Sequence, residues 1–280
     1  MPQADLAGVL AAERALMNRF AKEYESNPLF NSYFYEEERA RYITWVIDSL
    51  RKAGVNPFTC RVLETGQSTG NNLELLGKAG FKNLTGIDIA EDMIAQARWR
   101  VAGARFVHGS IENHSFGSER FDVILAAFTL HHMLDPRAFF AMADRILAPR
   151  GWLFLIEYDA LGLSNATWSK PFVESAAFPL RRIMKLKNRR FFSKMHYTPA
   201  AFNPAHRLLS FAEILAAMGD PQRYEIDRRT RGLLLPAFNY ALVKHGRSDR
   251  FLYRMLNAID NALTPPGLGN LQWIAARRKD

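Results

Sequence analysis

An acid and three small residues alternate between positions 64 and 70: Glu64, Gly66, Ser68 and Gly70. Glycine accepts a positive φ angle and has no side chain that would block a ligand. A turn that leads into a helix N-terminus directs free backbone N–H groups at a bound molecule. Asp88 closes the next strand, where a carboxylate can accept both hydroxyls of a ribose. The spacing predicts a site for an adenosine-containing ligand.

The acid at position 64 distinguishes between two classes of ligand. A dinucleotide site typically carries the pattern G-x-G-x-x-G, and Glu64 would repel the pyrophosphate of such a ligand. The same carboxylate suits a ligand that carries an ammonium and a sulfonium group. The alternative interpretation is an ordinary α/β crossover turn in which the glycines only permit close packing.

The elements that position these residues follow the order strand, glycine turn, helix, strand over residues 61–88. Short apolar runs predict the strands, and apolar residues at helical spacing predict the helices. Further strands are expected at 105–108, 121–127, 152–156, 224–226 with 233–235, and 271–275. Further helices are expected at 6–24, 42–50, 94–98, 136–147, 211–218 and 251–263.

Four segments in this order resemble the motifs of class I S-adenosylmethionine-dependent methyltransferases. They read RVLETGQSTG, GIDIAEDMIAQAR, FDVILAAFTLHHMLDP and ILAPRGWLFLIEYD, and the resemblance covers roughly residues 55–160. Two positions depart from the family pattern. Ser68 stands where the middle glycine is usual, and Ser110 stands where an aspartate usually binds the adenine amino group.

The resemblance implies an α/β fold that is Rossmann-like and doubly wound. It has a mostly parallel seven-stranded sheet whose last strand is antiparallel, a helical N-terminal lid, and inserted substrate-binding elements. The expected organisation is a lid at 1–55, a cofactor-binding core at 56–160, and the substrate-binding insertion with the remaining strands at 161–280.

The family's cofactor, S-adenosyl-L-methionine, is the expected ligand. Asp88 would bind the ribose, and the end of the 121–127 strand would face the methionine part, in the crevice where ligands of open α/β sheets bind. Carried over position by position, the expected cofactor-binding residues are Glu64, Thr65, Gly66, Gln67, Gly70, Asp88, Ile89, Met93, Ser110, Ile111, Ala126 and Ala127.

His132 is the candidate catalytic residue, because histidine titrates near working pH and could take a proton from an oxygen acceptor. The alternative is that the pair His131 and His132 only shapes the loop. Tyr35, His131 and Tyr158 are candidate substrate contacts, although the aromatic residues of the lid could simply pack. Glu157 could line the acceptor site or act as a structural hydrogen-bonding group. No set of residues has metal-ligand spacing.

Composition restricts the remaining choices. The chain has 280 residues, one cysteine and a net charge of +9. A single cysteine excludes an intramolecular disulfide and fits a reducing compartment. The N-terminus lacks the pattern of a secretory signal, and no apolar run approaches the ~20 residues that span a bilayer. The expected location is the cytoplasm. An alternative is that the protein also contacts the inner face of a membrane peripherally.

The positive charge is concentrated after residue 160, and residues 179–197 are its densest segment. This segment has seven Lys and Arg residues, no acid, and interleaved apolar residues. Such a helix can lie on an anionic membrane surface, cap a pocket for an anionic substrate, or bind RNA. The segment could equally be a solvated face.

Three functions remain open on these grounds. The first is methyl transfer to a small or lipid-linked acceptor, with oxygen preferred as the acceptor atom and no stable nucleic-acid partner. The second is an RNA or protein methyltransferase that uses the basic half of the chain. The third is a non-catalytic binding protein with the methyltransferase fold, to which the serines at 68 and 110 point.

Overall fold

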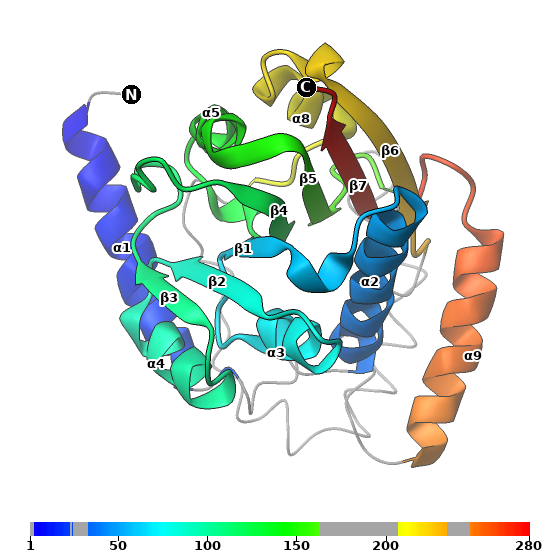
Figure 1. Cartoon of the computed structure of the whole chain (residues 1–280). Helices are drawn as coiled ribbons and strands as arrows, with labels where there is room; N and C mark the ends of the chain where they lie inside the picture. Colours follow the sequence, from blue (N-terminus) through cyan, green and yellow to red (C-terminus); the bar gives the residue numbers. More distant parts are fainter. Residues whose placement is uncertain (1–2, 23, 25–32, 163–206, 234–246) are drawn as a thin grey trace.

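A computed structural model of the chain describes residues 3–22, 24, 33–162, 207–233 and 247–280 (Figure 1). One seven-stranded sheet forms its centre, in the order β3-β2-β1-β4-β5-β7-β6. The strands are β1 (Arg61–Thr65), β2 (Asn83–Asp88), β3 (Arg105–His108), β4 (Phe121–Ala127), β5 (Leu147–Tyr158), β6 (Tyr224–Arg231) and β7 (Leu271–Arg278).

The sheet has the predicted topology. Strands β3, β2, β1, β4 and β5 pair in parallel, and β7 runs antiparallel to both β5 and β6. The strand order reverses direction between β1 and β4, so their carboxyl ends form the crevice where open α/β sheets bind ligands. The prediction of a doubly wound sheet with an antiparallel last strand is confirmed.

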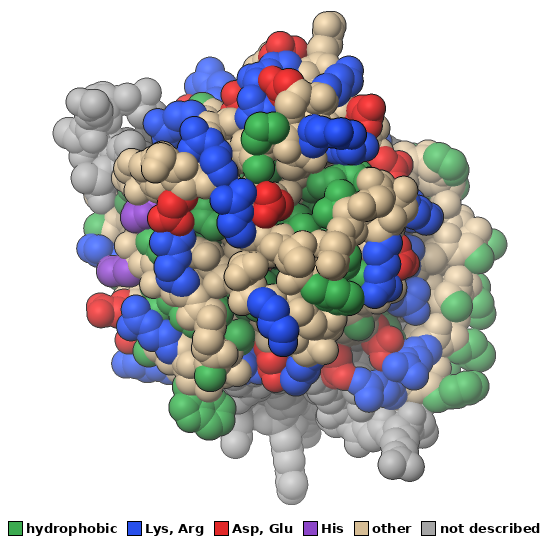
Figure 2. Space-filling view, viewed as in Figure 1, with side chains coloured by type: hydrophobic (Ala, Val, Ile, Leu, Met, Phe, Trp, Pro, Cys, Tyr) green, Lys and Arg blue, Asp and Glu red, His purple; other side chains and the backbone are tan. Residues whose placement is uncertain are grey.

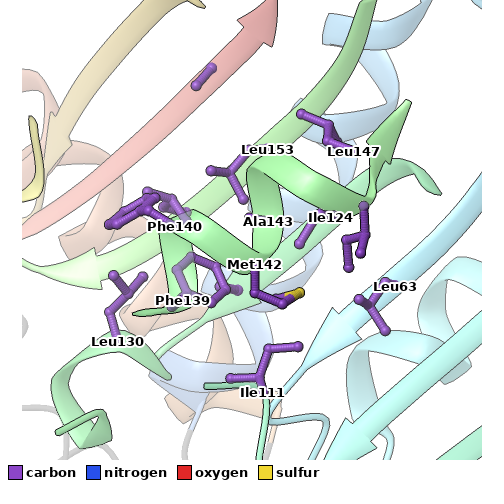
Figure 3. Packing of buried hydrophobic residues seen from close by; sticks show 14 of the residues in the cluster. Leu63, Ile111, Ile124, Leu130, Phe139, Phe140, Met142, Ala143, Leu147 and Leu153 are labelled. Carbon is purple, nitrogen blue, oxygen red and sulfur yellow. The ribbon is translucent and has the colours of Figure 1, made fainter. Parts of the chain in front are cut away.

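Alternate residues of the central strands pack on opposite faces of the sheet, because successive strand side chains point to opposite sides. On one face, Ile124 of β4 packs with Phe139 and Met142 of helix α5 (Pro136–Ile146), and Figure 3 shows these side chains meeting. On the other face, Leu125 packs with residues of helix α2 (Tyr33–Lys52). Both faces of β1 and β4 are therefore buried.

The remaining helices flank these layers. They are α1 (Gln3–Ala21), α3 (Asn71–Lys78), α4 (Glu91–Arg100), α8 (Phe211–Ala217) and α9 (Arg247–Leu263), with short 3₁₀ turns at Pro57–Thr59, Leu130–His132 and Pro221–Arg223. Helix α5 begins with Asp135 as its N-cap and proline at its first position, which is the expected start signal.

Two sequence predictions need correction. The strand predicted at 152–156 begins earlier, at Leu147, because the strand continues through the Pro149–Gly151 segment. The strand predicted at 224–226 and 233–235 is continuous from Tyr224 and ends at Arg231. Residues 234–235, most of the predicted insertion (163–206) and the basic segment 179–197 lie outside the described residues.

Helix α9 buries polar side chains and exposes several apolar ones. Its buried side carries Tyr253, Asn257 and Asp260, whereas Phe251 and Leu263 are among its exposed apolar residues. Figure 2 shows hydrophobic side chains along the edge of the molecule where α9 lies. Across the described ranges, no helix has the length and apolar character needed to cross a membrane.

Candidate functional site

A cavity of about 390 Å³ opens at the carboxyl ends of β1, β2 and β4. Its lining comes from the turn after β1, the loops after β2, β3 and β4, and the two N-terminal helices α1 and α2. This is the sheet edge at which the glycine pattern and the acids were expected to meet.

The turn after β1 adopts the backbone conformation that its glycines predicted. Gly66 has a φ of 64° and Gly70 a φ of 82°. A Cβ atom on Gly66 would lie 2.6 Å from Thr129 Cγ2, in the loop after β4. Glycine at position 66 therefore permits both the left-handed turn and the close approach of the β4 loop.

Ser68 has a left-handed φ of 50°, a conformation that glycine adopts without strain. Its backbone N–H donates to Asp88 Oδ2 at 2.8 Å, and its hydroxyl lies 3.4 Å from Met93 Sδ. The serine thus links the turn to β2 and α4.

Glu64 is buried at the end of β1, where one of its carboxylate oxygens is held. Asn72 Nδ2 donates to Glu64 Oε1 at 2.5 Å, and Tyr42 of α2 orients Asn72 by donating to Oδ1 at 2.6 Å. Glu64 Oε2 is buried and has no hydrogen-bond partner among the described residues. Burial raises the pKa of Glu64 to about 8, although Asn72 and the Arg39 charge act in the opposite direction. The site therefore holds an acceptor atom that a cationic ligand could satisfy.

Asp88 is fixed by the backbone on both sides. Ser68 N–H donates to Oδ2, and Ala90 N–H donates to Oδ1 at 2.8 Å. Burial raises the pKa of this carboxyl, whereas these backbone donors lower it. The carboxylate is held in place at the cavity wall, as a ribose-binding acid requires.

One buried carboxylate binds three successive residues of the loop after β4. Glu157 Oε1 accepts from the backbone N–H groups of Thr129 and Leu130, each at 2.6 Å. Its other oxygen lies 2.6 Å from His131 Nδ1. Glu157 is not part of the cavity lining, so the structure favours the structural alternative for this residue.

The two histidines of this loop have different partners. His131 is buried and bonded to Glu157, and its ring centroid lies 4.3 Å from that of His132. His132 Nδ1 lies 3.1 Å from Oε1 of Glu13, a buried acid on α1. Glu13 and both histidines line the cavity.

Aromatic side chains form another part of the cavity wall. The rings of Tyr35 and Phe128 meet edge to face with centroids 5.8 Å apart, and Phe128 lies 5.2 Å from Tyr158. Phe128 also has a left-handed φ of 56°, a strained conformation for this residue. Such strain is typical of positions that the surrounding structure holds for a functional reason.

The structure brings together most of the predicted site residues. Those that line the cavity are Tyr35, Glu64, Gly66, Gln67, Asp88, Ile89, Met93, Ser110, Ile111, Ala127, His131, His132 and Tyr158. Thr65, Gly70 and Ala126 lie outside this lining, and Gly70 instead caps α3.

Glu13, Asn72 and Thr129 are among the lining residues that were absent from the sequence prediction. Asn72 hydrogen-bonds Glu64, and Thr129 packs on Gly66 while its hydroxyl donates to Thr65 O at 2.9 Å. An acid among the apolar residues of the first helix was the only sequence signal for Glu13.

Comparison with known proteins agrees with this geometry. Residues 63–155 match the family described as a methyltransferase domain. Demethylmenaquinone methyltransferase of Tropheryma whipplei is 28% identical over 148 residues, which cover 52% of this chain and 59% of the relative. Ubiquinone biosynthesis O-methyltransferase of Hydrogenovibrio crunogenus is 29% identical over 163 residues, covering 55% of this chain and 64% of the relative. The chain thus matches about three fifths of the length of these curated relatives.

Solved structures share the fold over nearly the whole chain. An S-adenosylmethionine-dependent methyltransferase of Thermotoga maritima superposes with a TM-score of 0.56 at 19% identity, covering 96% of this chain and 100% of the other. Plantazolicin methyltransferase, in complex with a substrate analogue and S-adenosylhomocysteine, gives a TM-score of 0.57 at 15% identity and covers 99% of both chains. Residues 63–155 thus form a methyltransferase domain, and the strand order and the glycine turn are those of the class I S-adenosylmethionine-dependent methyltransferase fold.

Proposed function

We propose that this protein transfers the methyl group of S-adenosyl-L-methionine to a hydroxyl oxygen of a small or lipid-linked aromatic molecule. The observation that carries the proposal is one cavity whose lining contains both Glu64 and Asp88 and the pair of His132 with Glu13. Glu64 suits the ammonium group of the cofactor, Asp88 suits its ribose hydroxyls, and the histidine provides an acceptor for a proton.

The cofactor fits the residues at the β1 end of the cavity. Glu64 Oε2 is buried without a hydrogen-bond partner in the described part of the chain, and an ammonium group would satisfy it. The Asp88 carboxylate would accept hydrogen bonds from the ribose hydroxyls. The other residues that would hold the cofactor are Gly66, Gln67, Ile89, Met93, Ser110, Ile111 and Ala127.

When bound, the cofactor supplies a methyl group on a sulfonium, which is already a good leaving group. The protein's main task is to hold the acceptor in line with that methyl group. A hydroxyl acceptor must also lose its proton, and we propose His132, which lines the cavity, as the side chain that receives it.

The acceptor is proposed to carry an aromatic or quinone-like ring, because Tyr35, Phe128 and Tyr158 form an aromatic wall of the cavity. Such rings stack favourably on other rings. The relatives named for demethylmenaquinone and for ubiquinone biosynthesis support the same class.

Titration calorimetry with S-adenosylmethionine and S-adenosylhomocysteine tests the first part of the proposal. Release of S-adenosylhomocysteine with catechol and hydroquinone as acceptors, compared with benzoquinone and aniline, tests the second. We expect His132→Ala to lower turnover about 100-fold and to leave cofactor affinity within about two-fold. His114, which does not line the cavity, provides the matched control as His114→Ala.

Absence of cofactor binding, or equal loss of turnover and cofactor affinity in His132→Ala, would contradict the proposal. The proposed roles of residues 179–197, as a membrane contact or in binding RNA, fall on residues outside the described ranges. No observation at the site favours RNA or protein as the acceptor. Ser68, on which the non-catalytic alternative rests, has a left-handed φ like those of Gly66 and Gly70.

A further inference from the structure

A carboxylate from the N-terminal helix reaches the histidine of the β4 loop. Glu13 Oε1 lies 3.1 Å from His132 Nδ1, across 119 positions of sequence. Glu13 is only 6% exposed, and both residues line the cavity. Helix α1 therefore completes the side of the cavity that holds the histidine.

The contact bears on which ring nitrogen of His132 can take a proton. An ionised carboxylate can only accept hydrogen bonds, so opposite an ionised Glu13 the hydrogen of this contact is carried by His132 Nδ1. In neutral imidazole the other nitrogen, Nε2, is then the acceptor. A base whose tautomer is fixed in this way is ready to receive a proton without rearrangement.

The neighbouring histidine shows what a purely structural pair looks like. Glu157 binds His131 and also accepts two backbone N–H groups of the same loop. Glu13 makes no such backbone contact in the described structure, and its Oε2 is buried without a hydrogen-bond partner there. Glu157 thus holds the loop, whereas the hydrogen bond of Glu13 is directed at the ring of His132.

We propose that Glu13 is a positioning residue that holds His132 in the Nδ1–H tautomer and stabilises the imidazolium formed when Nε2 takes the proton of the acceptor hydroxyl. This inference rests on the proposed function. The oxygen uses its electron pair to form the new O–C bond, and the C–S bonding pair returns to sulfur. The proton remains on His132, next to the Glu13 carboxylate, until it passes to solvent.

The charges around His132 give the expected effect of removing Glu13. Burial lowers the pKa of His132, and so does His131; Glu13 and, more weakly, Glu157 raise it. Glu13→Gln removes one of the two carboxylates that favour the charged ring. The variant should therefore have a His132 with a lower pKa and weaker basicity.

The test compares Glu13→Gln and Glu13→Asp with Arg14→Gln, an exposed neighbour on the same helix. NMR titration of the His132 ring in the cofactor-free protein, assigned with His132→Asn, reports the tautomer and the pKa directly. We expect the Nδ1–H form in the wild type and in Arg14→Gln, and a lower pKa in Glu13→Gln.

The second readout is the pH profile of kcat with whichever hydroxyaromatic probe, catechol or hydroquinone, is methylated. Glu13→Gln should lower the plateau of kcat roughly ten-fold or more and move the acidic limb to lower pH, while the affinity for S-adenosylmethionine stays unchanged. Glu13→Asp, which keeps the carboxylate, should recover part of the loss.

An unchanged His132 titration in Glu13→Gln would overturn the inference, and so would a fall in kcat without any shift of the acidic limb. Failure of the proposed function gives a different result. The cofactor would then not bind in calorimetry or neither probe would be methylated, and the NMR titration would still decide whether Glu13 sets the tautomer of His132.

Discussion

The hydroxyl oxygens of Tyr35 and Tyr158 lie 2.6 Å apart and join the first turn of α2 to the last residue of β5. Both side chains line the cavity, and both rings pack on Phe128. This hydrogen bond connects the N-terminal helices to the sheet beside the proposed acceptor site, which is where a lid would need to close.

Tyr35→Phe removes this hydrogen bond and keeps the ring. A neutral hydrogen bond contributes about 1 kcal/mol, so we expect KM for the aromatic acceptor to rise about five-fold while the Kd of S-adenosylmethionine stays within about two-fold. Tyr42→Phe is the matched control, because its hydroxyl supports Asn72 and Glu64. Tyr42→Phe should lower the affinity for S-adenosylmethionine and leave KM for the acceptor unchanged. The assignment of Tyr35 to the acceptor side fails if both variants raise the Kd of S-adenosylmethionine equally.

Glu64→Gln should weaken S-adenosylmethionine binding. The variant removes the charge that the ammonium group would meet, and hydrogen bonds to charged groups contribute about 1.5–3 kcal/mol. We therefore expect Kd by calorimetry to rise between about 10-fold and 100-fold. The affinity of the wild type should also increase from about pH 5 to about pH 8, as the carboxyl loses its proton, whereas the affinity of Glu64→Gln should be flat over this range.

The same substitution should stabilise the cofactor-free protein. Burial raises the pKa of Glu64 from 4.5 to about 8, so between these values the folded chain holds a proton that the unfolded chain has released. The free energy of unfolding therefore falls as pH rises through this window. Glu64→Gln has no proton to release at this position, so its free energy of unfolding should not fall in this way. The difference in free energy of unfolding between the variant and the wild type, measured in urea, should grow from near zero at about pH 4 to a few kcal/mol at about pH 8. A constant difference at all pH values would show that Glu64 is not the titrating group.

Gly66→Ala should disrupt the contact between the β1 turn and the β4 loop. The added Cβ would lie 2.6 Å from Thr129 Cγ2, and the position has a left-handed φ. We expect a loss of about 2–4 kcal/mol in the free energy of unfolding and weaker cofactor binding. Gly117→Ala is the control, because Gly117 has a φ of 58° but no atom within 4 Å of the added Cβ. Equal destabilisation of the two variants would mean that backbone strain alone accounts for the effect.

Glu157→Gln tests whether one carboxylate holds the β4 loop. If the amide oxygen keeps the N–H groups of Thr129 and Leu130, the amide NH2 group faces His131 Nδ1, and a ring that is protonated on Nδ1 loses its acceptor. A buried unsatisfied donor costs about 1–3 kcal/mol, which urea unfolding would detect. Glu119→Gln breaks only the exposed ion pair with Arg105, and it should cost less than about 1 kcal/mol. A loss no larger than that of Glu119→Gln would contradict this role for Glu157.

The sequence predicted the strands and the glycine turn well because their causes are local. Val62 and Leu63 are apolar neighbours in a strand buried on both faces, and Gly66 and Gly70 each occupy a left-handed position. The motif order then implied the sheet topology, and with it the place of Asp88 at the cavity. These features need only the neighbouring residues and the family pattern.

The contact of Glu13 with His132 could not be predicted in this way. It joins residues 119 positions apart and depends on how α1 packs across the end of the sheet. The lining of the cavity was also only partly predictable. Thr65 directly follows Glu64 in a strand, so its side chain points to the opposite face, and the motif does not say which face the ligand meets.

Strand β7 lies between β5 and β6, although it is the last strand of the sheet in sequence. During synthesis, β6 leaves the ribosome before the strand with which it pairs. Residues 224–231 can therefore form their hydrogen bonds with β7 only after residues 271–278 have emerged. This side of the sheet, including the support that β7 gives to β5, can therefore be completed only after residues 271–278 have been made.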